Sequence, residues 1–195
     1  MAEERARRRR PPRFSGVIVH RDRLGRYSIR YPTDWELFVH DGSGEGEQDG
    51  GTFRPSPDDP RTFLNLWVRE LDRSIVAEDL DDLRDGVREG LKQLREVSIE
   101  SLVEIPLEGS NLLKLEAVYT FREDEATLKR KTWVIFADRW QYVVTWQGSS
   151  PAEYGHWLAM ANYSFATFEL PQALMLATDR ETIARSAEAL EDEGG

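Results

Sequence analysis

The stretch from residue 111 to residue 147 reads NLLKLEAVYTFREDEATLKRKTWVIFADRWQYVVTWQ, and it decides the fold class. Apolar and polar residues alternate along most of it, which is the period of a half-buried β-strand. The alternation is interrupted by the polar run Arg122–Ala126 and by the pair Asp138-Arg139, where the chain can turn. The stretch therefore predicts three consecutive antiparallel strands, at 111–122, 127–137 and 140–147.

Working outward, the same alternation predicts further strands nearer the N-terminus. Tyr27, Ile29 and Tyr31 share one face of a segment that Pro32 ends, and Trp35 opens a second short strand. The run Phe63–Leu71 is apolar on both faces, which predicts a fully buried strand. Residues 41–61 contain many Gly, Asp and Pro residues and are interpreted as a long loop, with Phe53 as a candidate for a brief strand inside it. The predicted extended segments before 111 are 14–20, 26–32, 35–39, 63–71 and 97–105.

Three helices are expected. Leu80, Leu83, Val87, Leu91 and Leu94 recur every three or four residues, so one stripe of this helix faces a core. A second helix is predicted to begin with Ser150 as N-cap and Pro151 in its first turn. A last helix is expected over 172–190.

Composition indicates one acidic domain without disulfides. The chain has 195 residues, of which 39% are hydrophobic, and a net charge of −10. The globular part is therefore a poor ligand for nucleic acid or anionic lipid. There is no Cys, no stretch of about 18 apolar residues and no signal-peptide-like segment, so a cytoplasmic protein without a transmembrane segment is expected.

The N-terminal 13 residues contain six Arg against two Glu. We interpret 1–13 as a disordered arm, 14–170 as the folded domain, and 171–195 as a C-terminal helix with an acidic tail. The arm is either a solubilising tail or a contact to an acidic partner, nucleic acid or an anionic membrane. Independent binding of nucleic acid is not expected from so acidic a body. The arginines in question are Arg7, Arg8, Arg9 and Arg10.

Three segments together resemble the PsbP-like proteins, whose fold is shared by the DcrB-like and Mog-type proteins. They are YSIRYPTDWEL at 27–37, FLNLWVREL at 63–71 and YSFATFEL at 163–170. The resemblance implies an α+β fold with an antiparallel sheet of about six or seven strands, flanked by helices on both faces. It also implies a binding or assembly role, and it supplies no catalytic residues.

Catalytic patterns are scarce in the sequence. His20, His40 and His156 lie far apart and lack metal-ligand spacing, and there is no nucleophile elbow of the G-x-S-x-G type. A site formed by spatial convergence stays open as an alternative. No catalytic residue and no cofactor is predicted.

The acidic part of the 41–61 loop has weak calcium-site character. Asp41, Glu45, Glu47 and Asp49 follow the ligand spacing of a calcium loop, but Thr52 stands where a bidentate Glu is required. The lack of Lys and the acidic charge argue against phosphate binding. A solvated loop is the simpler interpretation.

Aromatic side chains form the densest feature of the sequence. They are expected either in the core or in a cleft for an apolar peptide or partner helix. The candidates are Trp133, Trp140, Tyr142, Trp146, Tyr154 and Trp157.

These observations favour a non-enzymatic protein-binding module, acting as an assembly factor, adaptor or accessory subunit. One alternative is a small-molecule or metal-binding protein that uses the aromatic group or the acidic loop. Another is an enzyme with an unrecognised site. The sequence identifies neither the partner nor the oligomeric state.

Overall fold

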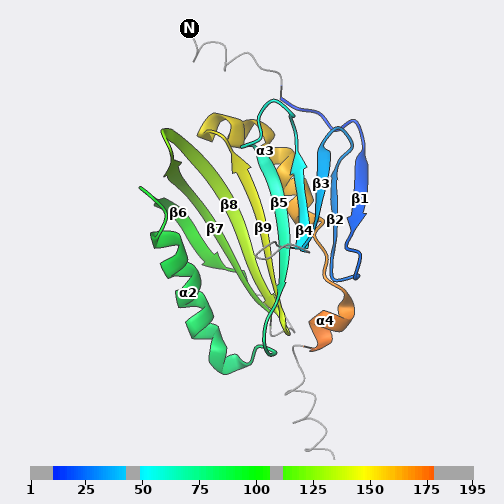
Figure 1. Cartoon of the computed structure of the whole chain (residues 1–195), viewed down its shortest axis with the longest axis vertical. Coiled ribbons are helices and arrows are strands. Elements are labelled where there is room, and N and C mark those ends of the chain that lie inside the picture. The colour runs from blue at the N-terminus through cyan, green and yellow to red at the C-terminus, as the bar shows by residue number, and fades with distance from the viewer. Residues whose placement is uncertain (1–10, 43–48, 106–111, 178–195) are drawn as a thin grey trace, which may run out of the picture.

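A computed structural model describes residues 11–42, 49–105 and 112–177 (Figure 1). The strands in this part are β1 (Val17–Arg21), β2 (Ser28–Pro32), β3 (Glu36–Asp41), β4 (Asp49–Arg54), β5 (Phe63–Glu70), β6 (Ser98–Glu104), β7 (Leu113–Glu123), β8 (Ala126–Ala137) and β9 (Trp140–Gly148). The helical elements are a 3₁₀ turn η1 (Ala77–Asp79), α2 (Leu80–Lys92), α3 (Pro151–Ala166) and α4 (Gln172–Ala177). No helix within these residues is long and apolar enough to span a membrane.

Seven of the strands form one antiparallel sheet in the order β3-β4-β5-β9-β8-β7-β6. The three strands predicted from 111–147 are confirmed as β7, β8 and β9, which pair with one another in chain order. Asp124 and Asp138, at the two connecting turns, adopt positive φ angles of 54° and 53°. Asp tolerates this conformation better than most residues, because its short side chain bonds locally.

The segment around Tyr27 forms a strand as predicted, but this strand does not join the large sheet. β2 pairs with β1 to make a separate hairpin. Its other edge is occupied by the chain after α3, where Ser28 and Glu169 exchange two backbone hydrogen bonds of 2.9 Å. Tyr27, Ile29 and Tyr31 all point into the core, so burial of one face holds the hairpin in place.

The interpretation of 41–61 as a loop is wrong in part, because β4 occupies six of its residues, including the brief strand considered at Phe53. Gly and Asp disfavour strands by local propensity, but here β4 pairs with neighbours on both sides. A Cβ atom on Gly50 would lie 2.0 Å from the backbone oxygen of Leu66, so only glycine permits this close approach to β5. Tertiary pairing therefore overrides a sequence pattern typical of a turn.

The expected covering of both sheet faces by helices is met only in part. Leu83 and Val87 of α2 contact Leu113, Leu115 and Phe136 of β7 and β8. A helix of 13 residues is about 20 Å long, and it covers only a fraction of seven strands spaced about 4.8 Å apart. Helix α3 contacts β8 and β9 from the opposite, core side of the sheet.

Helix α3 begins as predicted, with the Ser150 hydroxyl accepting a hydrogen bond from the Glu153 amide at 3.1 Å. It contributes Tyr154, Met160, Ala161 and Phe165 to the main core. The last predicted helix is present as α4, and the remainder of 172–190 lies outside the described residues.

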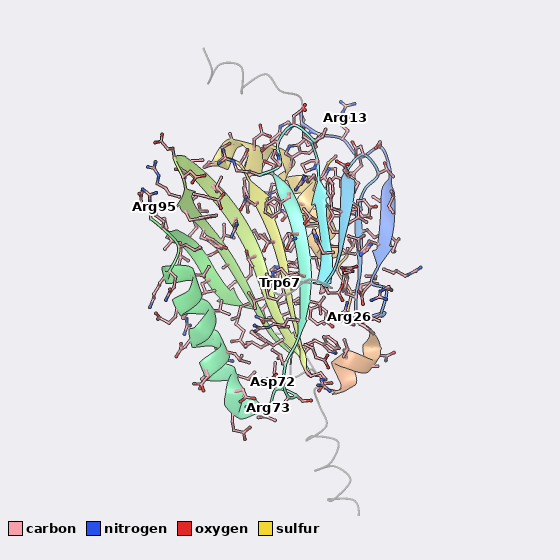
Figure 2. All side chains as sticks on the ribbon, viewed as in Figure 1. Arg13, Arg26, Trp67, Asp72, Arg73 and Arg95 are labelled. Carbon is pink, nitrogen blue, oxygen red and sulfur yellow. The ribbon has the colours of Figure 1, made fainter. Side chains whose placement is uncertain are left out.

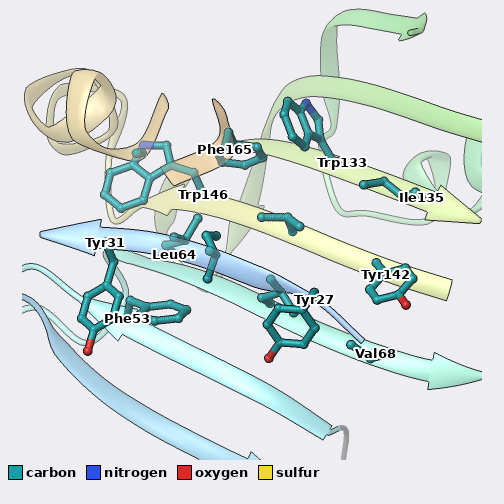
Figure 3. Packing of buried hydrophobic residues seen from close by; sticks show 14 of the residues in the cluster. Tyr27, Tyr31, Phe53, Leu64, Val68, Trp133, Ile135, Tyr142, Trp146 and Phe165 are labelled. Carbon is teal, nitrogen blue, oxygen red and sulfur yellow. The ribbon is translucent and has the colours of Figure 1, made fainter. Parts of the chain in front are cut away.

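The main core lies between the sheet, the β1–β2 hairpin and α3 (Figure 3). Leu64, Leu66 and Val68 of β5 point into it. The expectation that β5 is buried on both faces is wrong, because Phe63 and Trp67, on the opposite side, are only partly buried. The side of the sheet that carries Trp67 is therefore the side that α2 covers incompletely.

Candidate functional site

The three histidines do not come together. His20 packs on Tyr27 and Phe53, and burial lowers its pKa although the charge of Asp22 raises it. His40 lies 2.9 Å from the hydroxyl of Thr52, and His156 contacts Trp157 on α3. Since Thr52 and Phe53 are neighbours in a strand, His20 and His40 lie on opposite sides of β4.

The acidic candidates for a calcium site are only partly described, because Glu45 and Glu47 lie outside the described residues. Asp41 and Asp49 face each other as a Cα pair across β3 and β4. Asp49 also forms an ion pair with Arg26. No group of three or more acidic or His side chains that would suit a metal occurs in the described part of the chain.

The aromatic candidates lie in the core or against it. Tyr142 and Trp146 are fully buried, and Trp133 and Tyr154 are buried nearly as well. The Trp146 ring stacks on Trp35 and donates its N–H to the Tyr154 carbonyl at 3.2 Å. Trp140 and Trp157 are partly buried and pack on the same cluster. The structure thus favours the core alternative for these six residues, and Arg7 to Arg10 lie outside the described residues.

Trp133 is also the centre of a charged group at β7 and β8. Glu116 accepts hydrogen bonds from the Trp133 indole at 2.6 Å and from Lys131 at 3.0 Å. The ammonium of Lys114 lies 3.2 Å from the centroid of the Trp133 ring. Burial lowers the pKa of Lys114 to about 8, Lys131 adds to this effect, and Glu116 opposes it.

A cleft opens between α2 and the incompletely covered side of the sheet, with a cavity volume of about 410 Å³. Its walls are mainly apolar and come from the helix, β8 and the end of β5. They include Leu71, Leu83, Val87, Leu91, Val134 and Phe136. Both the volume and the apolar lining are typical of sites that bind a ligand or a partner side chain.

Two glycines of α2, Gly86 and Gly90, also line this cleft. They are one helical turn apart, so they lie on the same side of the helix. A Cβ atom added to either would meet nothing within 4 Å. Each interior glycine costs a helix about 1 kcal/mol relative to alanine, so the open space is maintained at a cost in stability.

Polar groups occupy the rim of the cleft. Arg69 and Asp82 provide one charge of each sign, and Gln141 contributes an amide. The Gln141 side-chain oxygen is buried, and no hydrogen-bond donor within the described residues reaches it. A second hollow of about 470 Å³ adjoins at Leu71, Asp82 and Leu83, and continues past Asp72 and Arg73. Figure 2 shows Trp67 farther along β5 and Asp72 with Arg73 beyond the end of that strand.

No family model matches the sequence, and no curated protein matches it. Solved structures do match. The cyanobacterial PsbP protein CyanoP of Synechocystis sp. PCC 6803 superposes with a TM-score of 0.56 at 13% identity, over 82% of this chain and 95% of that one. The chain has a PsbP-like fold.

Two further structures agree with the PsbP-like fold. The Ran-binding protein Mog1p of Saccharomyces cerevisiae matches with a TM-score of 0.50 at 10% identity, over 82% of this chain and 98% of that one. A protein of Bacteroides thetaiotaomicron VPI-5482 matches with a TM-score of 0.50 at 14% identity, over 80% of this chain and 48% of that one. At these identities the comparisons establish the fold alone.

Within the PsbP-like fold, the cleft is the feature that sequence reasoning missed. The stripe of Leu and Val residues on α2 was correctly expected to face a core. The signal overlooked was the pair Gly86 and Gly90, because interior glycines four residues apart weaken a helix without any evident local purpose. Their role can be recognised only in the tertiary structure, where Gly86 and Gly90 line the cleft opposite the sheet.

Proposed function

We propose that this protein is a non-enzymatic protein-binding module, and that it receives an apolar element of its partner in the cleft between α2 and the sheet. The observation that carries the proposal is the apolar cleft beside Gly86 and Gly90. In this proposal α3 closes the core face of a PsbP-like sandwich, while α2 only half covers the other face.

The energetics of the cleft support an apolar partner. Leu83, Val87 and Val134 remain partly accessible at its walls, and covering apolar surface releases about 25 cal/mol per Å². Arg69 and Asp82 at the rim would orient the partner, since rim charges contribute to specificity more than to affinity. The free Gln141 oxygen is suited to accept one hydrogen bond from the partner.

The comparison with Mog1p supports the same class of function. Mog1p is described as a Ran-binding protein, so at least one protein with this fold binds another protein. The comparison does not identify the partner of the present chain, because at 10% identity no binding residue can be transferred from Mog1p.

Filling the cleft tests the proposal. A photo-crosslinking amino acid at position 90 of the tagged full chain, irradiated in native cell extract, is expected to capture a specific protein. Gly90→Leu should abolish co-purification of that protein while leaving the fold intact, because the new side chain enters open space.

Gly155→Leu is the matched control. Gly155 lies in α3, and an added Cβ also meets nothing within 4 Å there, but the residue does not line the cleft. If Gly155→Leu and Gly90→Leu retain the partner equally well, the cleft is not the binding site. If the crosslinker at 90 captures nothing above the level seen at 155, the protein-binding proposal fails.

The cleft also favours one second candidate, a small apolar ligand with a single hydrogen-bond donor. A volume near 410 Å³ falls in the range of small-molecule sites, and Gln141 provides the acceptor. A melting temperature that rises with an apolar ligand in the wild type, but not in Gly90→Leu, would identify this function instead.

A further inference from the structure

Strand β1 differs from the other edge strands of this structure. It lies at the outer border of the molecule (Figure 1), and it pairs with β2 alone. Val17, Ile18 and Val19 are consecutive β-branched residues, each more than 40% exposed. By contrast, the large sheet ends in β3, which has an acidic residue at each terminus, and in β6, which has a bulge and glutamates. Such devices protect edges from pairing, and β1 has only the charged Arg21 at its end.

The register identifies which backbone groups of β1 are free. Ser28 and Arg30 of β2 direct their backbone N–H and C=O groups away from β1, toward Glu169 and Thr167. Their partners across the hairpin are Arg21 and Val19. Antiparallel pairs alternate, so Val17, Val19 and Arg21 all direct their N–H and C=O groups to the open side.

The hydrogen bonds on the other side of β1 agree with this assignment. The Asp22 amide donates to the Tyr27 carbonyl at 3.1 Å, and the Thr33 amide donates to the Gly16 carbonyl at 3.1 Å. The even-numbered residues of this segment therefore direct their backbone N–H and C=O groups toward β2. Within residues 11–42, 49–105 and 112–177, three N–H and three C=O groups of β1 have no backbone partner and remain available to one extended chain along the free edge.

The positive charge around the free edge of β1 indicates which kind of partner segment could pair with it. Residues 13–32 hold five Arg and one acidic residue, in a protein with a net charge of −10. Arg26 is paired with Asp22. The other four arginines are exposed, and none has an ion-pair partner within the described residues; they are Arg13, Arg21, Arg23 and Arg30. A second copy of β1 would add like charge here, whereas an acidic chain would complement it.

We propose that β1 is a strand-addition site for an extended segment of a partner protein in which acidic and apolar residues alternate. The backbone of that segment would bond to Val17, Val19 and Arg21. Val17, Val19, Arg21 and Arg30 lie on one face of the hairpin, so the acidic side chains of the segment would lie on that face, and its apolar side chains would lie beside the exposed Ile18 on the other face. This mode obtains affinity from main-chain hydrogen bonds and specificity from side chains, and it is separate from the cleft.

The test uses the full chain and a fluorescent peptide of alternating glutamate and valine, with a lysine–valine peptide for comparison. We expect the glutamate peptide to bind and to slow amide exchange at Val17, Val19 and Arg21, while exchange at Ile18 and His20 is unchanged. Val19→Pro removes an outward N–H that β2 does not use, so the hairpin should fold and peptide binding should weaken about tenfold or more.

Val19→Thr is the matched control and should bind like the wild type, because it keeps the amide and the β-branch. Exchanging Arg21 and Arg30 for Glu should reverse the preference toward the lysine peptide. The proposal is overturned if Val19→Pro binds as well as Val19→Thr, if both peptides bind alike, or if neither binds. It is also overturned if the wild type dimerises and Val19→Pro does not, since a second copy then occupies the edge.

Discussion

The guanidinium of Arg26 binds the carboxylate of Asp22 through two hydrogen bonds of 2.7 Å, and both side chains are buried. Arg26 also contacts Asp49 at the start of β4 and lies over the ring of Trp140. Arg26 therefore joins the turn of the β1–β2 hairpin to the large sheet through its ion pair with Asp49. This contact is the main ionic link between these two parts among the described residues.

Removing the cation should strongly destabilise the protein. Arg26→Met leaves Asp22 without its partner in a buried site, which costs about 3–5 kcal/mol. Urea unfolding measures the change. Arg30→Met on the same hairpin is the control, and it should stay within about 0.5 kcal/mol of the wild type, because Arg30 is exposed. A similar loss for both variants would argue against a special role for the buried pair.

The same pair predicts a dependence on acid. Burial alone would raise the pKa of Asp22, but the hydrogen bonds and charge of Arg26 outweigh it and lower the pKa below its ordinary value of 3.8. The stabilisation by the carboxylate is therefore present above pH 4 and is lost as the pH falls through the lowered pKa. The stability difference between wild type and Asp22→Asn should be constant near neutrality and should shrink in acid.

Lys114 predicts a second increase of stability with pH, in the alkaline range. Its pKa in the folded protein is about 8, against an ordinary value of 10.5. Between these values the unfolded chain holds a proton that the folded protein has lost, so stability should rise with pH. Burial raises the pKa of Tyr27 and Tyr142, which lowers stability once unfolded tyrosines ionise near pH 10.

The useful window for this measurement is therefore about pH 8 to 9.5. Urea unfolding across it should show a positive slope in the wild type and a flatter one in Lys114→Met. Equal slopes would mean that another group releases the proton.

The two sides of the sheet should respond differently to loss of a tryptophan. Trp146 is fully buried, and Trp146→Ala should cost about 3–5 kcal/mol. Trp67 is partly buried on the side that α2 leaves uncovered, so Trp67→Ala should cost much less. Chemical denaturation distinguishes these outcomes, and comparable losses would mean that the Trp67 side is covered in solution.

Glycines of this protein should fall into two classes when changed to alanine. Gly86→Ala and Gly90→Ala should each stabilise by about 0.5–1 kcal/mol, because the helix gains propensity and the methyl group meets open space. Gly148→Ala should destabilise, because its Cβ would lie 2.2 Å from the Tyr154 amide nitrogen. Thermal unfolding of the three variants is the measurement. A loss of stability at 86 or 90 would indicate that the cleft is narrower than described.

The local pattern of apolar and polar residues predicted most of the strands and helices. Where the prediction failed, the cause was the same: contacts between residues far apart in the sequence. The alternation in 111–147, the Leu and Val stripe of α2 and the Ser150 cap each depend on neighbours in the chain, and each was confirmed. Only a brief strand at Phe53 was considered where β4 lies, because the stability of β4 comes from strands on both sides and from the contact of Gly50 with Leu66, which no local window contains. The hairpin position of β2 was missed for the same reason, since Glu169 supplies its second edge.

The candidate sites show the same division. Residue type marked the aromatic group, and tertiary structure places it in the core or against it. The calcium site stays a prediction, because Glu45 and Glu47 lie outside the described residues. The cleft and the β1 edge involve ordinary Leu, Val, Gly and Arg residues. Only the placement of surfaces that are distant in sequence makes such residues a site.

By itself the sequence determined the α+β fold class, most of the strands and helices, and the face that most of them present to a core. It could do so because the periods of helix and strand are short and the hydrophobic effect acts on each period separately. Tertiary structure alone decided how far α2 covers the sheet and which edge of the hairpin stays open. The coverage of the sheet and the open edge both depend on how elements far apart in the chain pack together. This packing is established only when the chain has folded.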